Sequence, residues 1–256
     1  MSDKPLKNAL VTGAARRIGS AIARSLAADG WSVAVHYQDS AEDAASVVND
    51  IKAAGCNAVA IQAELSDDRQ ATALIEQATK EIGPITCLVN NASVFEPDTI
   101  ETATADSWNR HIQANLQAPF FLTQRFSELL PDDQTGNVIN LLDQRVWNLT
   151  PHFVSYTVSK SGLWALTQSL ALALAPRIRV NGIGPGPALP SPRQSQEQFA
   201  EQCADTPLGQ GTSPEEISQA VQYILSAQSM TGQMIALDGG QHLGWAQPND
   251  DAAPVE

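Results

Sequence analysis

A tyrosine and a lysine four positions apart are the residues of this chain best suited by type and spacing to acid–base chemistry. Tyr156 and Lys160 would share one face of a helix, one turn from each other. A free phenol titrates near ~10, so its use as an acid near pH 7 requires a shift of roughly 4 kcal/mol. A cation at about 4 Å supplies about that much in an effective dielectric of ~20. The spacing also arises by chance on solvated helices, so the interpretation depends on the surrounding elements.

Those elements alternate along the chain as strand and helix. Apolar runs predict seven strands, at residues 8–12, 32–36, 58–62, 87–90, 136–141, 179–183 and 233–237. Helical patterns and end signals predict seven helices, at residues 18–29, 41–54, 67–82, 105–130, 156–175, 196–204 and 213–227. Pro119 should interrupt the hydrogen bonds of the long fourth helix and kink it. Strict alternation with short connections is typical of a doubly wound parallel α/β sheet with helices on both faces. We expect one domain over residues 1–242 and a partly disordered tail at 243–256.

Composition excludes several classes of partner. The 256 residues carry a net charge of −13, which argues against nucleic acid or an anionic membrane surface. Three scattered cysteines, no signal peptide and no apolar run of ~18 residues predict a cytoplasmic protein without disulfides or membrane spans. His111, His152 and His242 lack metal-ligand spacing, so no metal is expected.

The turn between the first strand and the first helix, Thr12 to Gly19, predicts a dinucleotide site. Such a turn needs small residues, so that the backbone approaches a pyrophosphate resting on the helix N-terminus. Gly13 and Gly19 are in place, but Arg17 stands where a further glycine is usual. One interpretation is a tight turn with solvated arginines; the other is a loop that brings a cation to the phosphates.

The end of the second strand bears on which dinucleotide binds. An NAD site favours Asp or Glu at the last strand position, and none stands there. His36, Ser40 and Arg17 could together hold a 2′-phosphate, which favours NADP(H). Asp39 works against a phosphate, so NAD(H) stays possible.

The order and spacing of several motifs now resemble those of the short-chain dehydrogenase/reductases over about residues 6–242. The motifs are Thr12-Gly13…Gly19, Asn90-Asn91-Ala92, Asn115, Tyr156…Lys160 and Pro185-Gly186. The resemblance implies an NAD(P)-binding Rossmann fold, a homotetramer and a small-molecule substrate. It implies that Tyr156 donates a proton, that Lys160 binds the nicotinamide ribose and lowers the pKa of Tyr156, and that Asn115 holds a water linking Lys160 to solvent. The cofactor-binding residues it implies are Gly13, Arg17, Ile18, Gly19, His36, Tyr37, Ser40, Glu64, Leu65, Asn91, Ala92, Ser93, Tyr156, Lys160, Pro185 and Gly186.

Two departures from the common family pattern point to a subgroup. Asp143 stands thirteen residues before Tyr156, where most members have Ser, and Arg17 replaces a glycine. Both changes resemble the pteridine reductases, and bacterial dihydromonapterin reductases are similar. In that subgroup the residue matching Phe95 stacks on the pterin, and those matching Ser93 and Arg17 touch pterin and cofactor phosphate. The residue matching Asp143 works with the tyrosine to protonate a ring nitrogen.

The chemistry of a carboxylate at position 143 also favours the pteridine reductase subgroup. An ionised Asp143 cannot donate a hydrogen bond to a ketone oxygen, and it raises the pKa of a nearby phenol. A pterin offers amino and ring N–H donors to it. Three alternatives stay open: Asp143 caps its loop and points away; the chain is a carbonyl reductase or alcohol dehydrogenase; or it is an inactive nucleotide-binding regulatory protein. Intact Asn115, Tyr156 and Lys160 argue against the last.

Overall fold

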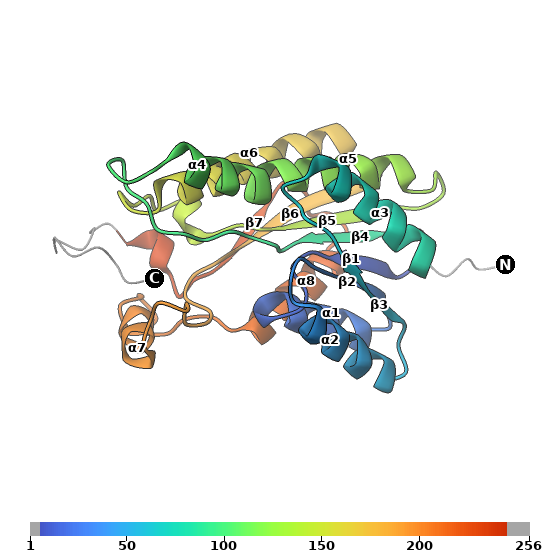
Figure 1. Ribbon diagram of the computed structural model, residues 1–256, viewed down its shortest axis with the longest axis horizontal. Coiled ribbons are helices and arrows are strands. Elements are labelled where there is room, and N and C mark those ends of the chain that lie inside the picture. The colour runs from blue at the N-terminus through green and yellow to red at the C-terminus, as the bar shows by residue number, and fades with distance from the viewer. Residues whose placement is uncertain (1–5, 245–256) are drawn as a thin grey trace.

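The sheet of this protein is a single seven-stranded parallel sheet, seen in a computed structural model that describes residues 6–244 (Figure 1). Its order is β3-β2-β1-β4-β5-β6-β7, and every neighbouring pair is parallel. The strands are β1 (Asn8–Val11), β2 (Ser32–Tyr37), β3 (Ala58–Gln62), β4 (Cys87–Asn90), β5 (Gly136–Leu141), β6 (Ile178–Pro185) and β7 (Met234–Leu237). The order reverses between β1 and β4, where open α/β sheets bind ligands beyond the carboxyl ends of their strands.

Helices cover both faces of the sheet (Figure 1). One face packs on α1 (Arg17–Ala28), α2 (Ala41–Ala53) and α8 (Pro214–Ser226). The other packs on α3 (Asp68–Ile82), α5 (Ala118–Leu129) and α6 (Val154–Leu174). The short helix α7 (Gln196–Ala204) stands beyond the carboxyl end of the sheet, on a segment that follows β6. Because the strands are buried on both faces, their sequences are continuous apolar runs rather than alternating ones. This confirms the expected doubly wound α/β fold.

The fourth predicted helix differs from expectation in its middle. It divides into α4 (Ala105–Ile112), a π-helical turn (Gln113–Gln117) and α5. Pro119 has no N–H, so the carbonyl of Asn115 lacks its α-helical donor. The interruption therefore falls in the predicted helix, one turn before the proline, and it centres on Asn115.

Two further expectations concern the ends of the chain and membranes. The predicted tail at 243–256 lies outside the described residues except for its first two positions. Among residues 6–244, none of the helices has both the length and the apolar character needed to cross a bilayer.

His36 does not have the role expected of it. Its ring is 2% exposed, and Nδ1 accepts a hydrogen bond from the backbone N–H of Gly13 at 2.9 Å. Nε2 lies 3.1 Å from the carbonyl of Ala63 and must therefore carry the proton. Burial lowers the pKa of His36 to about 4, so the ring is neutral. Both nitrogens are engaged by backbone, so the ring holds the Gly13 turn in place and is not a ligand for a 2′-phosphate.

This burial predicts a pH-dependent stability. The folded pKa of about 4 lies below the ordinary 6.5, so the contribution of neutral His36 is present above about pH 6.5 and is lost as the pH falls towards 4. At pH 5 the loss is roughly 2 kcal/mol of the free energy of unfolding. We expect His36→Asn, whose amide oxygen can still accept from Gly13, to lack this loss. Urea unfolding at pH 7 and pH 5 measures it; an equal change in both proteins would contradict the assignment.

Candidate active site

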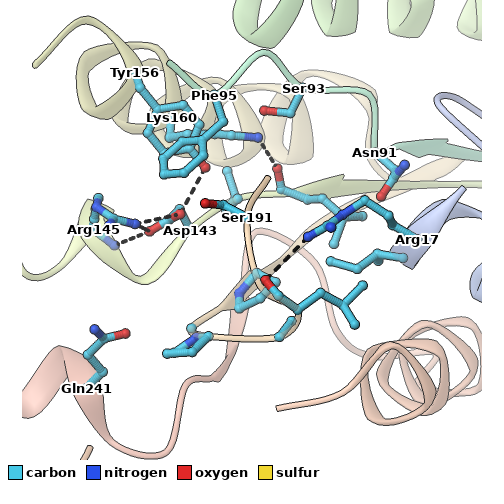
Figure 2. Close-up of a pocket in the computed structure, with 18 of the residues that line it drawn as sticks. Arg17, Asn91, Ser93, Phe95, Asp143, Arg145, Tyr156, Lys160, Ser191 and Gln241 are labelled. Atoms are coloured by element: carbon cyan, nitrogen blue, oxygen red, sulfur yellow. Dashed lines mark hydrogen bonds and ion pairs between the residues drawn. The ribbon is translucent and has the colours of Figure 1, made fainter. Parts of the chain in front are cut away.

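A cavity beyond the carboxyl ends of the central strands brings together many of the predicted site residues (Figure 2). The predicted residues that line it are Arg17, Ile18, Asn91, Ser93, Phe95, Asp143, Tyr156, Lys160, Pro185 and Gly186. They come from the turn after β1, the loop after β4, the end of β5, the first turns of α6 and the end of β6. The parallel topology places all of these ends at one edge of the sheet.

Tyr156 and Asp143 are in direct contact. The Tyr156 hydroxyl donates a hydrogen bond to Asp143 Oδ2 at 2.9 Å, as Figure 2 shows. Burial raises the pKa of Tyr156 well above its ordinary value, and the charge of Asp143 raises it further, while the Arg145 guanidinium opposes the shift. The phenol is therefore fully protonated at neutral pH and can act as a proton donor.

Asp143 has two tasks at once. It lies just beyond β5 as the N-cap of a 3₁₀ turn (Gln144–Val146), and its Oδ1 accepts from the backbone N–H of Arg145 at 2.8 Å. Its Oδ2 accepts from Tyr156, and its side chain is only 13% exposed. The carboxylate thus faces the phenol, as expected, and it also caps its loop, but it does not point away as the alternative required.

Lys160 bonds to the backbone at the end of β5. Its ammonium donates to the Leu141 carbonyl at 2.7 Å and lies 5.7 Å from the Tyr156 ring centroid. Burial lowers the pKa of Lys160 to about 8, which the charge of Asp143 partly offsets. The expectation that Lys160 lowers the pKa of Tyr156 is therefore not met here, because burial and Asp143 govern the phenol and the cation that opposes them is Arg145.

Asn115 lies behind the lysine on the π-helical turn and is fully buried. Its Oδ1 accepts from the backbone N–H of Val94 at 2.8 Å and from the Ser93 hydroxyl at 3.2 Å. Its amide donates to the Val94 carbonyl at 2.9 Å and to the Ser159 hydroxyl at 3.0 Å. The side chain thus joins the loop after β4 to α6 between Tyr156 and Lys160.

Phe95 lies in the cavity wall beside the phenol. Its ring stacks on Phe153 with centroids 4.7 Å apart and meets Tyr156 edge-to-face, also at 4.7 Å. Phe153 precedes α6 in the left-handed region, at φ +56°, which a bulky residue rarely adopts. That conformation brings the buried Phe153 ring under Phe95, so one face of Phe95 is already covered by protein.

A buried polar cluster holds the Phe95 loop against the start of α6. Asp98 accepts from the backbone N–H of Ser155 at 3.1 Å and, in a short bond, from its hydroxyl. The Ser155 hydroxyl also lies 2.7 Å from Nδ1 of His111, whose Nε2 accepts from the Glu96 backbone at 3.1 Å. Among residues 6–244 no group of three potential ligands suits a metal ion. The cluster therefore serves to fix the spacing between Phe95 and Tyr156.

The turn after β1 is shaped for close approach. Gly13 has φ +60°, and a Cβ at Gly19 would collide with the Gly13 carbonyl. The Asn91 amide donates to the carbonyls of Thr12 at 2.8 Å and Gly13 at 3.1 Å, and the Ala92 N–H donates to the Thr12 hydroxyl at 3.0 Å. The N-terminus of α1 has no capping side chain and no acidic residue in its first turn. Its N–H groups thus suit a phosphate.

Arg17 occupies the glycine position in conformation as well as in sequence. Its backbone has φ +53°, in the region that favours glycine. Its guanidinium donates to the carbonyls of Pro190 at 2.9 Å and Leu189 at 3.3 Å, on the loop after β6. Arg17 therefore joins the phosphate turn to the loop that closes the cavity, which supports a cation in the site over a solvated surface pair.

The other predicted cofactor residues lie around this turn without lining the cavity. Tyr37 ends β2 and Ser40 is the N-cap residue of α2. Glu64 follows β3 and accepts from Ser66 and Gln38, while Leu65 is buried in the core. These residues lie at or shortly after the carboxyl ends of β2 and β3.

Several cavity residues were missed by sequence reasoning. They are Arg145, Ser191, Gln194, Gln202 and Gln241, together with the segment 187–189. Arg145 stands two residues after Asp143, where a spacing argument could have found it. The others come from α7, the loop before it and the turn after β7, and their sequences carry no comparable signal.

Comparisons with known proteins identify the family of this chain. A family model described as "Enoyl-(Acyl carrier protein) reductase" matches residues 13–242. An uncharacterized oxidoreductase of Methylorubrum extorquens is 37% identical over 94% of this chain and 99% of its own length. The 3-oxoacyl-[acyl-carrier-protein] reductase FabG of Staphylococcus aureus is 34% identical over 94% of this chain and 100% of its own.

Solved structures extend the likeness. The FolM alternative dihydrofolate reductase 1 of Brucella suis, in complex with NADP, is 47% identical, with a TM-score of 0.91 over 96% of this chain and 98% of that one. A blue fluorescent protein from a metagenomic library, in complex with NADPH, is 33% identical, with a TM-score of 0.85 over 93% of this chain and 98% of that one. The chain therefore belongs to the short-chain dehydrogenase/reductase family of NAD(P)-dependent oxidoreductases.

Proposed function

We propose that this protein is an NADPH-dependent reductase of a pteridine-like substrate, a dihydropterin. The observation that carries the proposal is the Tyr156–Asp143 hydrogen bond of 2.9 Å, beside Phe95 in the cavity wall. A carboxylate at this place accepts hydrogen bonds but donates none, which suits the amino and ring N–H groups of a pterin. FolM of Brucella suis, named a dihydrofolate reductase, supports the same substrate class at 47% identity.

NADP(H) is the cofactor that best fits the dinucleotide turn. The two solved structures described above hold NADP and NADPH. In this chain the open N-terminus of α1 suits the pyrophosphate, and Arg17 supplies a cation beside it. The 2′-phosphate would lie near Arg17 and Ser40, since His36 is engaged by backbone on both ring nitrogens. Lys160 would hold the nicotinamide ribose.

The proposed reaction reduces a carbon–nitrogen double bond of the ring. A reduced nicotinamide held by Lys160 through its ribose would supply a hydride, which is one proton and two electrons, to the carbon. The electron pair released from the double bond takes a proton at nitrogen from the Tyr156 hydroxyl. Asp143, which already accepts from that hydroxyl, then passes a solvent proton back to the phenolate.

A carbonyl reductase is the second candidate, and the FabG relative at 34% identity favours it. An ionised Asp143 argues against it, because it cannot donate a hydrogen bond to a carbonyl oxygen. An inactive regulatory protein is the third. The intact positions of Asn115, Tyr156 and Lys160 argue against that candidate.

The family resemblance also leads us to propose a homotetramer in the cytoplasm. Helices α4, α5 and α6 expose the apolar side chains of Trp108, Phe120 and Leu172, which are suited to burial between subunits.

Loss of NADPH absorbance with a panel of acceptors tests the substrate class. We expect turnover with dihydrobiopterin or dihydrofolate and little with a simple diketone. Asp143→Ser should reduce pterin turnover roughly tenfold or more and raise ketone turnover, because a hydroxyl can donate to a carbonyl. Asp143→Asn is the matched control for the negative charge, because it removes the charge of the side chain and keeps its shape. Unchanged pterin turnover in the serine variant would contradict the proposal.

Removal of the phenolic hydroxyl tests the proton donor. Tyr156→Phe should lower kcat by about 10²-fold or more, because the phenol is the proposed source of the proton at the reacting nitrogen, while the Kd for NADPH stays within about twofold. Single-turnover kinetics and fluorescence titration with NADPH measure the two quantities. Residual turnover above a few per cent of wild type would be inconsistent with the acid role.

The pKa of Lys160 predicts an alkaline limit to activity. Burial lowers this pKa to about 8, so the ammonium that would hold the ribose is lost as the pH rises through about 8. The pKa of Tyr156 is raised, so the phenol stays protonated there and does not cause the fall. We expect kcat/KM for NADPH to decline above about pH 8. A flat profile to pH 9.5 would count against a role for the Lys160 charge.

A further inference from the structure

Arg145 is a buried cation in the wall of the cavity. Its side chain is 10% exposed, and it rises from the 3₁₀ turn (Gln144–Val146) that Asp143 caps. Figure 2 shows its guanidinium beside the Asp143 carboxylate, on the side away from Lys160. A guanidinium is seldom buried in this way unless a charge or an aromatic ring receives it.

Two kinds of contact fix the Arg145 guanidinium in place. Nη1 lies 3.3 Å from each carboxylate oxygen of Asp143. The central carbon lies 5.3 Å from the ring centroid of Phe153 and 5.6 Å from that of Phe95, within reach of a cation–π interaction. The stacked rings thus hold the guanidinium on one side, and the guanidinium holds the carboxylate on the other.

The contacts leave Asp143 with little freedom. Its Oδ1 accepts from the Arg145 backbone at 2.8 Å, both oxygens face the guanidinium, and Oδ2 also accepts from Tyr156. Without the guanidinium, a carboxylate with only 13% exposure would lose its ion-pair partner beside a buried phenol. It would then be free to turn towards solvent, which would weaken its contact with Tyr156.

We propose that Arg145 is a positioning residue of this site: it holds Asp143 as a fixed hydrogen-bond acceptor against Tyr156 and thereby sets the preference for substrates with N–H donors over bare carbonyls. This inference rests on the function proposed above. It assigns to Arg145 an action through Asp143, in addition to its packing against Phe95 and Phe153.

A double-mutant cycle separates action through Asp143 from packing alone. Arg145→Met keeps an apolar stem beside the rings and removes the charge. We expect it to lower the single-turnover rate with dihydrobiopterin roughly tenfold or more, with the Kd for NADPH unchanged within about twofold. In the Asp143→Asn background the same substitution should lower the rate less than about threefold, because the partner charge is already gone. Arg145→Lys should restore part of the rate.

Arg193→Met is the matched control. It removes a second guanidinium whose central carbon is also 5.6 Å from the Phe95 ring, while the Asp143–Arg145 pair stays. Its effect should be the same in the wild-type and Asp143→Asn backgrounds. Thermal unfolding of every variant with NADPH bound identifies any that fails to fold, and Arg145→Gln, which also removes the charge, then serves in place of Arg145→Met.

The outcomes distinguish the two proposals. If Arg145→Met costs the same factor in both backgrounds, Arg145 acts by packing and the inference is wrong, although the pterin function stands. If the wild type reduces only carbonyl acceptors, the proposed function fails and the preference assigned to Arg145 fails with it. A strongly non-additive cycle with dihydrobiopterin, together with an additive Arg193→Met control, supports the inference.

Discussion

The site depends on keeping a carboxylate next to a buried phenol. Burial and the Asp143 charge both raise the pKa of Tyr156, so this contact works against ionisation of the phenol, which stays protonated at neutral pH. The arrangement holds because Asp143 is compensated by the guanidinium of Arg145 and by the N–H groups of its own turn. The Tyr156 hydroxyl thus donates to the neighbouring carboxylate, while the Lys160 ammonium donates to the Leu141 carbonyl.

The scaffold supports this contact from two sides. Behind it, the cluster of Asp98, Ser155 and His111 ties the loop after β4 to the first turn of α6, which sets Phe95 against Tyr156. Asn115, on a π-helical turn, joins the same loop to α6 one turn further along. Buried polar groups of this kind fix geometry because each is fully paired and none can shift without breaking a bond.

At the dinucleotide turn, a residue of the expected type has a role other than the expected one. His36 stands near the end of β2, where the sequence predicts a phosphate ligand, yet its neutral ring links the Gly13 backbone to Ala63. Arg17, in contrast, stands where a glycine is usual and serves as a cation. Its backbone is left-handed, and its guanidinium reaches the loop over the cavity. The dinucleotide turn is therefore held by the histidine and charged by the arginine.

Much of the molecule follows from the sequence alone. Strand and helix alternate in clear periods, so the doubly wound sheet, the glycine turn and the gathering of Arg17, Phe95, Asp143, Tyr156 and Lys160 at one edge were all predictable from local pattern and parallel topology. The direction in which each polar side chain points was not. Lys160 turns to the Leu141 carbonyl, His36 turns inward, and Arg145 inserts beside Phe95 and Phe153. Those choices depend on burial and on partners distant in sequence, which only the packed tertiary structure brings within bonding distance.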